Sequence, residues 1–218
     1  MLCTRMLRTP AIALAALPAV AVAVCVACSP TDPAQAGDDG GDGDGQAAIS
    51  PEGFVAATVG SGAQSPDCPI GSPMPWLSIG SATSGTPAIV ESSSSATIDC
   101  AVRAVGKGYD VSVSVVVQGP GGGSFTLDSP QGLGAVRVSG AQGLAASFAS
   151  TQAGATYQES DCTLSFTYLG QPVPDSPSVF PSRIWAHVSC PTAQPQGASD
   201  ASDTCDGEAD FLFERCAE

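Results

Sequence analysis

Alternation of apolar and polar residues is the feature that most constrains the fold of this chain. In residues 95–104, SATIDCAVRA, every second residue from Ala96 onward is apolar. The segment 109–118, YDVSVSVVVQ, repeats the pattern from Tyr109 onward. A period of two places such residues on one face of a β-strand. The glycine-rich residues 105–108, VGKG, join the two segments and have the length of a hairpin turn.

The same period of two recurs along the rest of the chain. Four further segments show it: 123–129, 134–140, 162–168 and 183–190. In the second of these, the pattern predicts that Val136 and Val138 are buried. The segment 143–150, GLAASFAS, is the one stretch that fits a short helix, and its small residues fit a packed loop as well.

Turns rich in glycine and proline separate these segments, at PGGG, SPQG and GQPVPDSP. Strands that alternate with such turns, without a helical period between them, are typical of antiparallel sheets. The sequence therefore predicts an all-β fold, an antiparallel β-sandwich of about seven to nine strands with disulfides.

Cysteine usage points to an oxidising compartment, because the chain has nine cysteines and cytosolic thiols stay reduced. Six follow the N-terminal segment and are candidates for disulfides: Cys68, Cys100, Cys162, Cys190, Cys205 and Cys216. Alternation places three of them on buried faces, Cys100, Cys162 and Cys190. The spacing leaves the pairing open. Since no two of the six form a CxxC pair, disulfides are favoured over a metal site, and we expect no metal or cofactor.

The first residues have the pattern of an export signal. Arg5 and Arg8 supply positive charge, and the apolar segment 11–27 that follows is interrupted only by Pro18. An uncleaved transmembrane helix is the alternative, because the segment approaches the length that spans about 30 Å of hydrocarbon. Its alanine content and Pro18 favour the export signal.

The end of this segment resembles a known processing site. Val26, Ala27 and Cys28, followed by Ser29, resemble the lipobox of bacterial lipoprotein precursors. In that family a diacylglyceryl group is attached to the cysteine thiol, and the leader is cut just before this residue. Cys25 departs from the pattern, since it stands where an aliphatic residue is usual. The resemblance implies lipidation of Cys28.

Two other processing sites compete with Cys28. Lipidation at Cys25 would put Val24 where a small residue is needed, and it would leave an odd number of cysteines downstream. The segment 34–36, AQA, offers an ordinary signal-peptidase site before Gly37, but polar residues and prolines separate it from the apolar segment. Cys28 is therefore favoured, and a secreted protein that begins at Gly37 is the alternative.

Lipidation at Cys28 would make the membrane a partner of the protein through its anchor. Two or three acyl chains hold a protein stably without a spanning helix. Ser29 follows the cysteine, whereas an Asp in that place favours retention at the inner membrane of Gram-negative bacteria. The resemblance therefore implies a lipid-anchored protein of the cell envelope, at the outer membrane.

Composition divides the chain into a signal peptide at 1–27, a lipidated cysteine with a Gly/Asp-rich linker at 28–48, and one domain at 49–218. The linker has five aspartates and no aliphatic residue larger than Ala, so we expect it to be disordered. Its DDGGDGDG stretch misses the ligand spacing of an EF-hand, because Ile49 occupies the twelfth position counted from Asp38. A solvated linker is therefore favoured over a calcium site.

The net charge limits the kinds of partner that the protein can bind. From Cys28 onward the chain has five basic and 21 acidic residues, a net charge of −16. Such a surface repels phosphate backbones and anionic lipid, so a nucleic-acid partner is not expected.

Trp185 and His187 are the candidate ligand-binding residues. Alternation in 183–190, RIWAHVSC, places both on the face opposite Ile184, and His187 is the one histidine of the chain. An aromatic ring offers apolar area and an imidazole offers a hydrogen bond, so the pair could grip a sugar ring. Packing of Trp185 under a loop is the favoured alternative, because tryptophan is mostly buried.

No residue is identified as catalytic, and an enzyme is the less favoured interpretation. The chain lacks a G-x-S-x-G elbow and a phosphate-binding loop. The acids of the predicted strands lie at exposed positions or strand ends: Asp99, Asp110, Glu159 and Asp161. A hydrolase that uses carboxylates stays open as an alternative.

The acidic tail is the second place where a site could lie. Its acids are close in sequence: Asp203, Asp206, Glu208 and Asp210. Weak calcium binding, as in an adhesion module, is one interpretation, and an acidic solvated loop is the favoured one, because no known ligand spacing is met. Phe211 and Phe213 predict a final strand that joins the sheet.

With its lipobox and Gly/Asp linker, the chain resembles myxobacterial lipoproteins of unknown function in two segments, RIWAHVSCP and CDGEADFLFERC. This resemblance implies export and tethering but no activity. The leading hypothesis is a membrane-tethered lipoprotein with a non-catalytic binding or structural role in the cell envelope. An envelope protein or a glycan would be its ligand.

Overall fold

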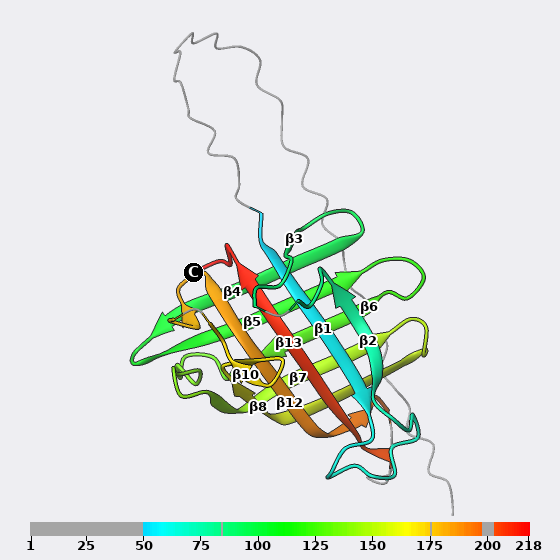
Figure 1. The fold of residues 1–218 in the computed structure, drawn as a ribbon. Coiled ribbons are helices and arrows are strands. Elements are labelled where there is room, and N and C mark those ends of the chain that lie inside the picture. Colours follow the sequence, from blue (N-terminus) through cyan, green and yellow to red (C-terminus); the bar gives the residue numbers. More distant parts are fainter. Residues whose placement is uncertain (1–49, 84, 175, 198–202) are drawn as a thin grey trace, which may run out of the picture. The chain divides into compact units, whose positions relative to one another are not determined.

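Antiparallel strands make up almost all of the regular structure. The computed structural model describes residues 50–218 except 84, 175 and 198–202 (Figure 1). The strands of this part are β1 (Glu52–Gly60), β2 (Met74–Ile79), β3 (Val90–Glu91), β4 (Ala96–Val105), β5 (Gly108–Val117), β6 (Gly123–Asp128), β7 (Ala141–Ser150), β8 (Ala155–Ser165), β9 (Thr167–Tyr168), β10 (Gln171–Pro172), β11 (Val179–Phe180), β12 (Arg183–Pro195) and β13 (Cys205–Glu214). Every pairing between these strands is antiparallel, which confirms the predicted all-β class.

The predicted number of seven to nine strands matches the nine strands that are longer than two residues. Thirteen strands form in the described part, and four of them, β3, β9, β10 and β11, have two residues each. The predicted leader at 1–27 and the segment 28–48 with Cys28 lie outside the described residues.

One sheet contains eleven of the strands. Its order is β2-β1-β13-β12-β8-β7-β6-β5-β4, with β3 beside β1 and β11 beside β12, while β9 and β10 form a separate hairpin. In Figure 1, β1, β13 and β12 cross in front of β4, β5 and β6. The indole N–H of Trp76 in β2 donates to the carbonyl oxygen of Phe148 in β7 at 3.2 Å. The sheet therefore folds over on itself until it is nearly closed.

The core fills the space between the two halves of this sheet. The middle residues predicted to face inward on β4 and β5 are buried, with Ile98, Val102 and Val113 at most 4% exposed. Toward the strand ends the prediction holds less well, because Ala104 is exposed and Tyr109 and Val117 are only partly buried. Phenylalanine rings join the halves: Phe125 of β6 and Phe211 of β13 have ring centroids 5.9 Å apart. Apolar side chains of both halves thus share one buried layer, whose burial drives the closure.

Two local predictions are wrong. The segment 143–150 is neither a helix nor a loop but most of β7, because Leu144, Ala146 and Phe148 alternate inward against β6 and β8. Val138 is 75% exposed rather than buried. The hydrogen bonds Arg137 N–H to Gly140 O and Gly140 N–H to Arg137 O close a tight turn with Val138 at its tip, and this turn ends the alternation.

All six candidate cysteines are paired. The disulfides join Cys68 to Cys205, Cys100 to Cys216 and Cys162 to Cys190. The prediction that these residues form disulfides is confirmed. Three disulfides in one domain indicate an oxidising, extracytoplasmic location. Within the described residues, no helix is long and apolar enough to cross a membrane.

The Cys100–Cys216 disulfide closes the β4 end of the sheet. It brings the residue after it alongside β4, where the N–H of Val102 donates to the Ala217 carbonyl and the N–H of Ala217 donates to the Cys100 carbonyl, each at 2.8 Å. The edge of β4 is thereby paired at Cys100 and Val102. Covered edges remove the open backbone groups that lead to aggregation.

We expect the double variant Cys100→Ala, Cys216→Ala to lose about 2 to 4 kcal/mol of unfolding free energy. Urea denaturation measures this loss. Hydrogen exchange should show faster exchange at β4, because the covering segment is released from it. The matched control is Cys162→Ala, Cys190→Ala, which should leave β4 exchange unchanged. Equal effects of both variants on β4 would contradict a specific role in edge closure.

Candidate functional site

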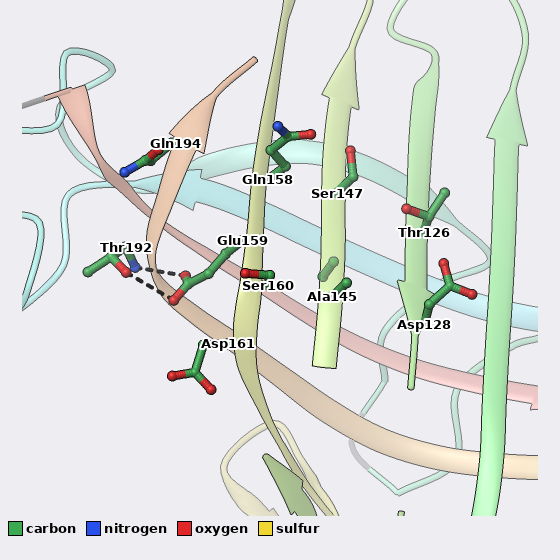
Figure 2. A pocket seen from close by; sticks show the side chains of 11 residues that line it. Thr126, Asp128, Ala145, Ser147, Gln158, Glu159, Ser160, Asp161, Thr192 and Gln194 are labelled. Carbon is green, nitrogen blue, oxygen red and sulfur yellow. Dashed lines mark hydrogen bonds between the residues drawn. The ribbon is translucent and has the colours of Figure 1, made fainter. Parts of the chain in front are cut away.

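The outer face of the sheet carries an open groove of about 620 Å³. It crosses β6, β7, β8 and β12, and Figure 2 shows the side chains that line it. Apart from Ala145 and Ala146, its lining residues are polar: Thr126, Asp128, Ser147, Gln158, Glu159, Ser160, Asp161, Thr192 and Gln194. The groove is therefore a surface for hydrogen bonding rather than an apolar pocket.

Strand register places the central polar residues in one row. Thr126 of β6 pairs with Ser147 of β7, and Ser147 pairs with Gln158 of β8. Gln158 in turn pairs with Gln194 of β12. Neighbouring strands lie about 4.8 Å apart, so the row presents hydroxyl and amide groups at a regular spacing across four strands.

Two β-bulges shape one side of the groove. Between the pairs Leu144–Cys162 and Ala146–Glu159, β8 has one residue more than β7. Between the pairs Cys190–Gly207 and Ala193–Cys205, β12 has one residue more than β13. The Cys162–Cys190 disulfide links β8 and β12 beside these bulges. Bulges bend a strand and redirect its side chains. As a result, none of the four consecutive residues from 158 to 161 is buried.

Glu159 is held in a fixed orientation at this bulge. The backbone N–H of Thr192 donates to Glu159 Oε2 and the Thr192 hydroxyl donates to Glu159 Oε1, both at 2.9 Å (Figure 2). Both oxygens of one carboxylate thus accept hydrogen bonds from one residue of β12.

The charge of the groove is negative. Asp128, Glu159 and Asp161 line it, and none of its lining residues is Lys, Arg or His. Figure 2 shows Asp128 on one side and Glu159 with Asp161 on the other, with Ser147 among the uncharged side chains between them. A ligand for this surface would be neutral or cationic, since the charged side chains that line the groove are all carboxylates.

A second hollow of about 390 Å³ adjoins the groove over β4 and β5 and shares Asp128 with it. The Ser112 hydroxyl donates to Asp128 Oδ1 at 2.6 Å. The expectation that Asp110 is exposed or at a strand end is corrected here, because it is 6% exposed. Its carboxylate accepts the backbone N–H groups of Gly132 and Gly134, so Asp110 fixes the β6–β7 connection.

Trp185 is packed and does not line the groove. It is fully buried on the outer face of the sheet in a small cluster with Phe54, Tyr168 and Leu212. Phe54 and Trp185 are both register partners of Leu212, and the Tyr168 ring of β9 covers Trp185 with ring centroids 5.4 Å apart. The ring therefore presents no surface to a ligand in this structure, which matches the packing alternative.

His187 lies in the next row of the same face and is partly buried. Its Nδ1 is 3.2 Å from Asp210 Oδ1. Burial alone would lower the pKa of His187. The hydrogen bond and charge of Asp210, with the charges of Glu208 and Asp206, outweigh burial and raise the pKa above its ordinary 6.5. His187 lines neither hollow, so the predicted pair with Trp185 does not share a cavity here.

The acidic tail is a strand and not a solvated loop. Asp206, Glu208 and Asp210 alternate with buried residues along β13 and lie on one face of it. Burial, followed by the charges of Glu208 and Glu159, raises the pKa of Asp206. In the described part, Glu159, Cys162 and Cys190 are a group of metal-ligand residue types, but both sulfurs are bonded in a disulfide and are not thiolates.

Comparison of the chain with protein-family models, curated proteins and solved structures finds no match. The geometry described above is therefore the basis for any functional conclusion. Sequence reasoning missed the groove residues Ser147, Gln158 and Gln194. Each of these residues is a polar residue at an outward position of its strand, and the sequence shows that much. The register that aligns these positions across the strands is not visible in the sequence.

The raised pKa of His187 predicts a stability that depends on pH. Protonated His187 stabilises the folded state fully below pH 6.5, and this contribution is lost as the pH rises through the higher folded pKa. We expect the melting temperature to fall between about pH 6 and 8. His187→Gln should flatten this slope, since the chain has one histidine. If the melting temperatures of the wild type and His187→Gln change equally with pH across this range, the prediction is contradicted.

Proposed function

We propose that the protein is an exported lipoprotein, anchored through Cys28, whose β-domain binds a ligand without catalysing a reaction. The complete pairing of the six downstream cysteines supports export, and the lipobox resemblance supports the anchor. Because no free thiol is left in the domain, a mature chain that begins at Cys28 would have one unpaired cysteine. Lipidation accounts for that thiol, and the lipobox resemblance names the same residue.

The location follows from the same residues. Disulfides indicate an extracytoplasmic domain, and an acylated Cys28 would hold it at a membrane surface. Ser29 in place of Asp supports the outer membrane. A secreted form that begins at Gly37 is the competing outcome.

The groove supports a binding role for a neutral ligand rich in hydroxyl groups, such as an envelope glycan. Its row of hydroxyl and amide side chains can donate and accept hydrogen bonds at regular intervals. The carboxylates at its sides would accept hydrogen bonds from ligand hydroxyls, and they would repel phosphorylated or acidic ligands. An uncharged or basic segment of an envelope protein meets the same requirements.

Carboxylate catalysis is less well supported by this geometry. Asp128 and Glu159 are on β6 and β8, whose backbones lie two strand spacings apart, about 10 Å. Glycosidases use carboxyl groups about 5 to 9.5 Å apart, one of which must carry a proton. Asp128 accepts a hydrogen bond from the Ser112 hydroxyl, and both oxygens of Glu159 accept hydrogen bonds from Thr192, so both carboxylates are already engaged within the sheet. Binding therefore accounts for these residues better than proton transfer does.

Cys28→Ser tests the anchor. We expect this variant to lose acyl labelling completely and to leave the washed membrane fraction of cells that keep the wild-type protein there. Cys25→Ser is the matched control and should keep both the label and the location. Acyl labelling that persists in Cys28→Ser would refute lipidation at this residue.

Ser147→Trp tests the groove. A large side chain in the central row should lower the affinity for neutral envelope oligosaccharides by at least about tenfold, as measured by calorimetry or a glycan array. Gln142→Trp is the control, because Gln142 is an exposed residue of β7 that does not line the groove. Binding that survives Ser147→Trp would place the ligand elsewhere, and no binding by the wild-type domain would remove the glycan proposal.

A further inference from the structure

The connection between β6 and β7 exposes large apolar side chains. Leu133 is 71% exposed and Val138 is 75% exposed, more than the other exposed large apolar residues of the described chain, Leu169 at 50%, Met74 at 40% and Val90 at 36%. Scattered apolar residues on a surface are common, but here two lie within one short connection.

This connection is held firmly, so the exposure is built into the fold. Asp110 accepts the N–H groups of Gly132 and Gly134 on either side of Leu133. Val136 and Tyr109 exchange two backbone hydrogen bonds, at 2.8 and 3.1 Å. Hydrogen bonds therefore fix the segment that exposes Leu133 and Val138, while Val136 between them is buried.

Two cations accompany these side chains. Lys107 is at the tip of the β4–β5 hairpin, and Arg137 precedes Val138. Both are exposed, and neither has an ion pair among the described residues, whereas Arg183 and Arg215 pair with glutamates. A Cβ at Gly134 would overlap the backbone of the hairpin at Val105, so the hairpin and the connection lie side by side.

We propose that Leu133, Val138, Lys107 and Arg137 form a tip that docks on a bilayer containing anionic phospholipid. Such a bilayer has negative headgroups above hydrocarbon, which matches cations that flank apolar side chains. The proposal rests on the proposed anchor only for bringing a bilayer within reach. The affinity of the tip for lipid is a property of the domain itself.

The net charge of −16 from Cys28 onward repels anionic lipid at long range, so contact at this tip depends on the charges close to it. Charges separated by more than a Debye length, about 8 Å at physiological salt, are largely screened. The exposed Lys107 and Arg137 belong to the tip itself, whereas the carboxylate that holds Gly132 and Gly134, that of Asp110, is buried. Two apolar side chains hold a protein only weakly, so the tip would orient a tethered domain rather than anchor a free one.

A tryptophan introduced at the tip reports on this contact. The two native tryptophans, Trp76 and Trp185, are 3% and 0% exposed, so their emission should not respond to vesicles. The test uses the unacylated chain from Ser29 to Glu218, which contains both apolar clusters and all three disulfides. Leu133→Trp should shift its fluorescence to the blue with phosphatidylcholine vesicles that contain phosphatidylglycerol.

The control is Gln118→Trp, an exposed residue just beyond the other end of β5. It should show no shift with the same vesicles. Adding Lys107→Glu and Arg137→Glu to Leu133→Trp should abolish the shift, and pure phosphatidylcholine should weaken it. No shift in Leu133→Trp, or an equal shift in Gln118→Trp, would overturn the tip proposal.

This outcome is separate from that of the anchor. If Cys28→Ser releases the protein from membranes while Leu133→Trp shows no shift, the anchor stands and the tip fails. If Leu133→Trp shows the shift while the acylation of Cys28→Ser is unchanged, the tip stands and the anchor fails.

Discussion

Closure of the curled sheet by Cys100–Cys216 is the constraint on which the rest of the structure depends. An antiparallel sheet of this length has two edges, and its inward side chains can be buried only if one half lies over the other. The disulfide fixes the end of β13 to β4, and the phenylalanines of both halves then fill the space between. The outward positions of the groove are aligned by the register between neighbouring strands of this same sheet.

The fold class could be predicted because alternation with period two is a local property of the chain. It located β4, β5 and β12 with their buried faces. It failed at β7, where Ala145 and Ala149 carry no polar signal on the outward face, although Leu144 and Phe148 alternate inward. It failed at Val138 because a turn of two residues interrupts the pattern, and this turn depends on hydrogen bonds that the sequence does not show.

The groove could not be predicted, because it depends on register between strands far apart in sequence. Gln158 and Gln194 come together only after two neighbouring bulges in β8 and β12 are placed, and a shift by one residue would turn these side chains inward. Asp110 was misjudged for a similar reason, since the loop that buries it folds back from beyond β6. Trp185 is buried because Tyr168 of β9 packs over its ring. The alternation of β12 alone does not predict this contact.

The central claim is that an oxidised β-domain is joined to a lipidated N-terminus at Cys28. The most direct test is the intact mass of the protein purified from its native membrane, measured before and after reduction. We predict a chain that begins at Cys28, carries acyl groups, and gains six hydrogens when its three disulfides are reduced. An unacylated chain that begins at Gly37 would contradict the anchor, and a mass that does not change on reduction would contradict the oxidised fold.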